Sequence, residues 1–216
     1  MKIKSFQGGY DKNLCYVLWC ETTKHSVIID PSVEILPIIE FVKNHDLIID
    51  KILITHTHHD HIRYLGDMMD SYPLAKVYIS RNTPLESIDN FTPLEHHDVV
   101  MVGEHIILSL YTPGHYIDSI CYWVKNKDIL FTGDTMFVGR TGRTISSRSS
   151  VLDLYNSIYN ILLKLPEKTI VYPGHHYGYS TTISIKENIK QSPFFQCNSL
   201  EKFKLVMQNY ENNRKK

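Results

Sequence analysis

The segment 55–61, which reads Thr-His-Thr-His-His-Asp-His, limits the possible folds more than any other part of the chain. It directly follows a short apolar run that is typical of a buried strand. Because alternate residues of an extended segment point the same way, His56 and His58 can converge on one metal ion. Asp60 and His61 can then turn toward a second ion. A solvated polar loop is the alternative, but imidazoles clustered without a shared proton or metal ion are unfavourable.

Three further strand ends each carry one side chain of a type that binds metal ions. They are Thr112-Pro113-Gly114-His115, Thr132-Gly133-Asp134-Thr135 and Tyr172-Pro173-Gly174-His175. A histidine after Pro-Gly is by itself usually a turn residue. The occurrence of all three in this order after segment 55–61 predicts that His115, Asp134 and His175 belong to the same centre.

Strands and helices alternate along the chain, which predicts two mixed sheets between helices, in one domain over residues 1–216. Strands are expected at 1–6, 14–19, 26–29, 51–54, 77–80, 104–111, 119–124, 129–131 and 169–172. Helices are expected at 33–44, around Leu65, Met68 and Met69, and at 151–163, 182–190 and 199–208. The polar tail 211–216 is expected to be solvated and frayed.

Composition excludes several classes of partner. Lys and Arg total 23, as do Asp and Glu, so no overall charge attracts nucleic acid or an anionic membrane. No apolar run is long enough for a membrane span or a signal peptide, which predicts a cytoplasmic protein. The four cysteines form no Cys-x-x-Cys pair and are expected to be free thiols.

With these motifs in place, the sequence resembles the metallo-β-lactamase superfamily, whose His-x-His-x-Asp-His, His, Asp, His pattern it matches residue by residue. The resemblance implies an α/β fold of the four-layer αββα metallo-β-lactamase sandwich type and two divalent metal ions, zinc first, with iron or manganese as alternatives. The implied ligands are His56, His58 and His115 for the first ion and Asp60, His61 and His175 for the second, with Asp134 bridging both.

Such a centre has a clear hydrolytic chemistry. Coordination to a zinc-like ion can lower the pKa of water to about 7, so a metal-bound hydroxide is the expected nucleophile. Asp60 and Asp134 are the predicted catalytic carboxylates, and Asp60 could hold the proton of the hydroxide. Asp30, at another strand end, is predicted to orient a ligand histidine, although a turn residue before Pro31 fits its position equally well.

The stretch 133–143 resembles the glyoxalase II (hydroxyacylglutathione hydrolase) group, which hydrolyses thioesters of glutathione. That resemblance implies substrate contacts from Arg143 and Tyr177 and a small-molecule thioester substrate. A solvated basic loop is the alternative for the arginines of this region. Full-length members of the group have a larger helical C-terminal region, whereas fewer than forty residues follow Gly178 here.

Three other functions stay open at this point. A persulfide dioxygenase, which resembles this chain in its shorter C-terminal region, would use one iron held by His56, His115 and Asp134 while keeping the other residues of the motif. A lactone or ester hydrolase could use the same hydroxide. A metal-binding protein without catalytic activity is disfavoured by the complete ligand set.

Overall fold

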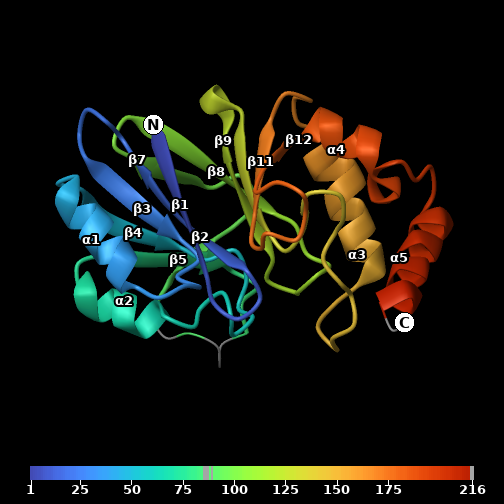
Figure 1. Cartoon of the computed structure of the whole chain (residues 1–216), viewed down its shortest axis with the longest axis horizontal. Helices are drawn as coiled ribbons and strands as arrows, with labels where there is room; N and C mark the ends of the chain where they lie inside the picture. Colours follow the sequence, from blue (N-terminus) through green and yellow to red (C-terminus); the bar gives the residue numbers. More distant parts are fainter. Residues whose placement is uncertain (85–87, 89, 215–216) are drawn as a thin grey trace.

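Two six-stranded sheets pack face to face in the computed structural model, with helices on both outer sides (Figure 1). The structure describes residues 1–84, 88 and 90–214. The predicted arrangement of two mixed sheets between helices is therefore confirmed.

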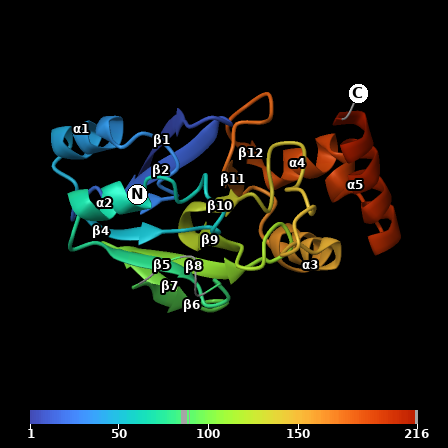
Figure 2. The same cartoon turned by 90° about the horizontal axis from the view of Figure 1, so that it is seen from below.

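The first sheet has the strand order β1-β2-β3-β4-β5-β6. Its strands are β1 (Lys2–Gly8), β2 (Asn13–Trp19), β3 (His25–Ile29), β4 (Ile48–Leu53), β5 (Lys76–Ser80) and β6 (Thr92–Leu94). The first three strands are antiparallel, and the pairs from β3 to β6 are parallel. Helices α1 (Leu36–Asn44) and α2 (Leu65–Ser71) cover the outer face (Figure 2).

The second sheet has the strand order β12-β11-β10-β9-β8-β7. Its strands are β7 (Val99–Val102), β8 (His105–Tyr111), β9 (Ile120–Val124), β10 (Ile129–Gly133), β11 (Ile170–Pro173) and β12 (Ile183–Ser184). Only β10 and β11 pair in parallel within the described part of this sheet. The covering helices are α3 (Val151–Asn156), α4 (Ile185–Gln191) and α5 (Leu200–Arg214). Shorter turns lie at Lys125–Lys127, Ser157–Ile161, Leu162–Lys164 and Pro193–Phe195.

Buried apolar side chains form three clusters, one for each interface between layers. One joins the two sheets and contains Tyr122 and Phe131. The second lies between the first sheet and α1 and α2 and contains Ile38 and Met68. The third packs the second sheet against α3, α4 and α5, and Phe203 is fully buried in it. Burial of this apolar surface holds the strand ends in fixed positions.

The structure differs from the sequence-based expectation mainly at element ends and sheet edges. The short strands β6, β7 and β12 were not predicted. The helix predicted from residue 33 begins at Leu36, next to Pro37, which its first turn tolerates. The helix predicted at 151–163 continues from α3 through a π turn and a 3₁₀ turn to Lys164. Part of the tail expected to be frayed is helical, because α5 runs to Arg214; residues 215–216 lie outside the described residues.

All four cysteines are buried and unpaired, as expected. Within the described residues, no helix is both long enough and apolar enough to cross a membrane.

Candidate metal centre

The loops after four strands, β4, β8, β10 and β11, meet at one end of the two sheets. Backbone hydrogen bonds tie these loops together across the sheets. Ile120 N donates to Thr55 O at 2.8 Å, and Gly174 N donates to Gly133 O at 2.8 Å. Gly174 O in turn accepts from Leu14 N at 2.8 Å. The positions of the side chains on these loops are therefore set by backbone contacts between both sheets.

Two glycines allow the loops to approach this closely. A Cβ added at Gly174 would lie 2.5 Å from Asp134 Oδ1 and 2.6 Å from His61 Cε1. A Cβ at Gly142 would lie 2.0 Å from the backbone oxygen of Asp134. Neither position can hold a larger residue without displacing the groups of the site.

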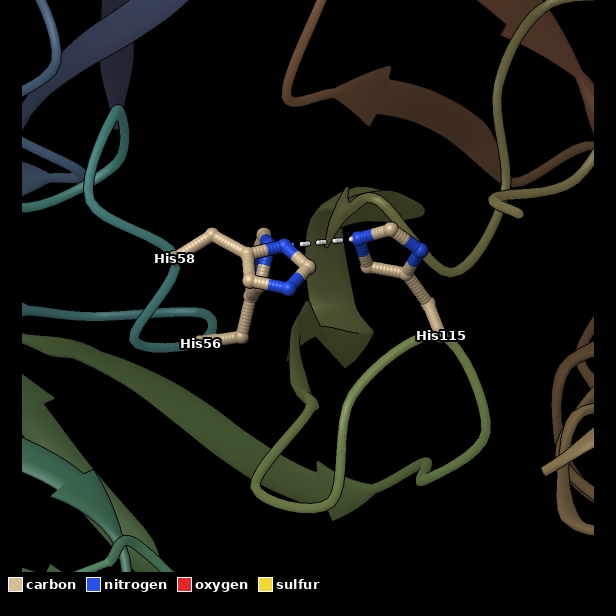
Figure 3. Close-up of side chains that lie close together, drawn as sticks. All are labelled: His56, His58 and His115. Carbon is tan, nitrogen blue, oxygen red and sulfur yellow. Dashed lines mark hydrogen bonds between the residues drawn. The ribbon is translucent and has the colours of Figure 1, made fainter. Parts of the chain in front are cut away.

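The first group of side chains consists of His56, His58 and His115. The Nε2 atom of His56 and the Nε2 atom of His115 each lie 3.0 Å from His58 Nδ1. Figure 3 shows the three rings, from two separate loops, pointing toward one another. One nitrogen atom from each ring lies within 4.8 Å of the other two, a spacing that could hold one metal ion.

The second group consists of Asp60, His61 and His175. The Nε2 atoms of the two histidines are 3.2 Å apart. Asp60 Oδ2 lies 3.3 Å from His175 Nε2 and 3.7 Å from His61 Nε2. This group also satisfies the spacing for a single metal ion.

Asp134 lies between the two groups. Its Oδ1 atom is 3.2 Å from His61 Nε2 and 3.4 Å from His175 Nε2, whereas Oδ2 is 3.5 Å from His115 Nε2. Oδ1 is buried and has no hydrogen-bond partner in the described part of the chain. One carboxylate thus presents an oxygen to each group, which is the arrangement that a bridging ligand requires.

In three of the histidines, His61, His115 and His175, the Nδ1 atom faces away from the site and forms a hydrogen bond. These hydrogen bonds select the tautomer that a metal ligand needs. His61 Nδ1 lies 2.9 Å from Asp30 Oδ2, and His115 Nδ1 lies 2.8 Å from the backbone oxygen of Arg143. His175 Nδ1 lies 2.9 Å from the backbone oxygen of Asp11. Each oxygen can only accept, so each Nδ1 carries a hydrogen, and in the neutral ring the Nε2 lone pair faces the site. These lone pairs and the unpaired Asp134 oxygen fit bound cations.

The charges of the site agree with this reading. Burial, and then the neighbouring His115, lowers the pKa of His58 to about 4. Burial alone would raise the pKa of Asp134, but His175 and His61 bring it well below its usual value, so the carboxyl group is ionised at neutral pH. Burial opposes a charge on His175, yet Asp134 and Asp60 outweigh burial and raise its pKa to about 9. The carboxylates therefore favour positive charge at this position.

A pocket of about 220 Å³ opens over both groups, and the two predicted substrate contacts, Arg143 and Tyr177, line it. Tyr177 stacks on His175, with the ring centres 4.7 Å apart, and its hydroxyl donates to Asp11 Oδ2. Arg143 forms a two-point ion pair with Glu211 of α5, at 2.7 and 2.8 Å. The structure thus brings Arg143 to the pocket but also gives its side chain an internal partner.

Sequence reasoning missed two side chains that support the loop from Thr55 to His61. The amide of Asn13, a fully buried residue, donates to Asp60 Oδ2 at 2.8 Å. Asp118 is also buried, and it accepts from Thr57 Oγ1 at 2.6 Å and from Thr57 N at 3.3 Å. No local pattern marks Asn13, while the only sequence signal for Asp118 is its proximity to His115.

The fold and the site define the class of protein. The sequence model of the metallo-beta-lactamase superfamily matches residues 8–175, and the chain belongs to this superfamily.

Among its relatives is a probable hydroxyacylglutathione hydrolase of Schizosaccharomyces pombe. It is 35% identical over 177 residues, which cover 80% of this chain and 67% of that protein. A probable polyketide biosynthesis zinc-dependent hydrolase, BaeB, of Bacillus velezensis is 31% identical over 209 residues, covering 94% of this chain and 89% of the relative. The crystal structure of ETHE1 from Myxococcus xanthus is 34% identical, with a TM-score of 0.88, and the match covers 97% of this chain and 91% of that one. The names of the first two relatives support a hydrolase.

Proposed function

We propose that the protein is a binuclear metal hydrolase that cleaves small-molecule thioesters in the cytoplasm, of the hydroxyacylglutathione hydrolase type. One observation carries the proposal. Next to the group of His56, His58 and His115 lies the second group, which consists of Asp60, His61 and His175. Asp134 directs one carboxylate oxygen to each group. The second group would give a second ion ligands of its own.

The residues of the chain would hold two divalent ions, and the ligand set of imidazoles and carboxylates suits zinc, iron or manganese. When bound, these ions supply Lewis-acid polarisation of a carbonyl oxygen and a water molecule acidic enough to be deprotonated near neutral pH. Zinc is the first choice, in line with the name of the Bacillus velezensis relative.

Asp60 is placed to act as a proton acceptor as well as a ligand. Asn13 and the neighbouring His175 hold Oδ2 in position. Hydrogen bonds from these groups lower the pKa of Asp60, although burial acts in the opposite direction. The carboxylate therefore stays ionised at neutral pH. It lines the same pocket as Tyr177 and Arg143, where the thiol side of a substrate would lie.

A mononuclear iron persulfide dioxygenase is the second candidate. The similarity to the ETHE1 structure, which spans nearly the whole of both chains, keeps this alternative open. In that case His56, His115 and Asp134 would hold the iron. The remaining ligand-type residues would then have other roles.

Metal content decides between the two candidates. We would measure zinc, iron and manganese per chain by mass spectrometry in the wild type and in His61→Ala, and assay both for hydrolysis of S-lactoylglutathione. Two ions in the wild type, one in the variant and a loss of kcat/KM of more than about 100-fold would support the hydrolase, since outer partners alone are worth about 10–100-fold.

A matched control is His25→Ala, because His25 also pairs with an aspartate but lies at the start of β3, outside the site. Its metal content and activity should equal those of the wild type. A single iron retained in His61→Ala, with oxygen consumed in the presence of glutathione persulfide, would overturn the proposed hydrolase.

A further inference from the structure

The C-terminal helix α5 packs against the loop that follows β10, and residues of this loop, among them Arg140, Thr141 and Arg143, line the metal pocket. Thr141 Oγ1 lies 3.3 Å from Met207 Sδ. The guanidinium of Arg140 lies 5.2 Å from the ring centre of Tyr210. Together with the ion pair of Glu211, these contacts place the last turns of α5 against the pocket rim.

The contact between Arg143 and Glu211 has two-point geometry. Nε of the arginine donates to Glu211 Oε1 at 2.7 Å, and Nη2 donates to Oε2 at 2.8 Å. Both donors on this edge of the guanidinium are thus occupied by one carboxylate. The side chains are 40% and 20% exposed, so a ligand can reach the pair from solvent. A substrate carboxylate would have to displace Glu211 from this edge or use the remaining Nη donors, where it meets a charge that Glu211 already neutralises.

Arg143 also lines two neighbouring pockets. On one side is the metal pocket, and on the other is a pocket of about 260 Å³ lined by His58, His115, Arg143, Ile145 and Ser146. Ile145 is 66% exposed and offers an apolar surface beside the arginine. A thiol arm that leaves the metal centre in this direction passes a neutralised cation and then an apolar side chain.

We propose that Glu211 is a specificity-determining residue: its carboxylate occupies the binding edge of Arg143, so the pocket selects thioesters with an uncharged thiol arm over those with a carboxylate at this position. The inference rests on the proposed function, because it takes the thiol side of a thioester to lie along Arg143. An internal carboxylate competes at an advantage, since it loses no translational freedom on pairing.

Binding of S-methylglutathione, which carries carboxylates but no free thiol, tests the inference without turnover. We would titrate it by calorimetry at low salt into metal-loaded wild type, Glu211→Gln and Glu211→Ala. The diethyl ester of the same compound, which keeps the amino group but has no carboxylate, serves as the control probe. We expect both variants to bind S-methylglutathione about 10-fold more tightly, the order expected when a charge-assisted pair becomes available, and to bind the ester as the wild type does.

Two further variants make the result specific. Glu201→Gln alters an exposed glutamate in the first turn of the same helix and should leave both affinities unchanged. In the double variant Arg143→Ala with Glu211→Gln, the gain should disappear. The inference is overturned if S-methylglutathione binds equally to the wild type and both Glu211 variants, if it binds to none of them, or if the ester gains as much as the acid.

A parallel assay of thioester hydrolysis tests the proposed function separately from the proposed role of Glu211. If no thioester is hydrolysed by any of these proteins, the proposed function fails. The ratio of affinities for the acid and the ester still decides the role of Glu211.

Discussion

Replacement of Asp30 by asparagine should selectively weaken metal binding by Asp60, His61 and His175. Asp30 Oδ1 accepts from Thr55 N at 2.7 Å, while Oδ2 accepts from Thr55 Oγ1 at 2.6 Å and faces His61 Nδ1 at 2.9 Å. In Asp30→Asn, the amide nitrogen takes the place of Oδ2 and can only donate. His61 would then have to carry its hydrogen on Nε2, which blocks the lone pair that faces the site. Asparagine tolerates the positive φ of 50° at this position, so the backbone can stay as it is.

The magnitude follows from the number and burial of the lost contacts. Two hydrogen bonds to one charged oxygen are affected, and Asp30 and its two partners are all buried. Each such bond is worth about 1.5–3 kcal/mol, but the two share one acceptor and are not additive. We expect a loss of about 3 kcal/mol in the free energy of unfolding. Orientation of a ligand by an outer carboxylate is worth about 10–100-fold in metal affinity, or about 1.4–2.7 kcal/mol.

The metal affinity is measured by competition with a chelator, followed by metal analysis of the separated protein. The free energy of unfolding is measured by urea denaturation of chelator-treated protein. Asp50→Asn is the control, because Asp50 Oδ2 lies 2.9 Å from His25 Nδ1 in a more exposed histidine–aspartate pair that contains no residue of the site. It should leave the metal content intact. If Asp30→Asn retained both ions with wild-type affinity, our view of Asp30 as the group that orients His61 would be wrong.

Three other outcomes follow from the structure. Burial opposes ionisation of Asp60, but His175, His61 and the amide of Asn13 together lower its pKa below the usual value. Asn13→Ala should therefore raise this pKa and shift the acid-side loss of metal to higher pH in a pH series of metal analyses. Asp118→Asn weakens the contacts with Thr57 and should lower the free energy of unfolding by about 1–3 kcal/mol in urea, with an unchanged value arguing against a supporting role. Burial raises the pKa of Cys121 to about 12, so iodoacetamide at pH 8 should modify this thiol only after unfolding, as read by peptide mass spectrometry.

Much of the candidate site could be predicted because its residues occur at the ends of buried strands. The apolar run Ile52-Leu53-Ile54 is recognisable by itself, and the polar residues after it must lie where the strand ends. His56 and His61 are almost fully buried there, as a metal site would require. The strand ends at Gly133 and Pro173 are recognisable for the same reason, which is why residues far apart in the sequence could be assigned to one centre.

The short strands at the edges of the two sheets could not be predicted from apolar runs. β6 contains Pro93 and is only three residues long, and β12 has two residues. Such segments are strands only because a neighbouring strand offers hydrogen-bond partners, as Val171 does for Ile183. Local propensity carries little information about pairing of this kind.

The C-terminal end of α5 shows the same limit for a helix. The sequence Glu211-Asn212-Asn213 has weak helical propensity, and it was expected to be frayed. In the structure the helix continues to Arg214. Contacts of Tyr210 and Glu211 with the loop after β10 stabilise these last turns, and those contacts depend on the tertiary fold.

Arg143 is a further residue whose contacts depend on the tertiary fold and not on the local sequence. A basic residue after Gly142 in this loop resembles a glutathione contact, but a sequence pattern specifies only the side chain and not its partner. A guanidinium at the pocket rim pairs with whichever carboxylate reaches it at the lowest entropic cost. Here α5 brings Glu211 to that position, as part of the chain itself. The side chain that pairs with Arg143 is therefore set by α5, which follows the last of the sequence motifs, and not by the motif that contains the arginine.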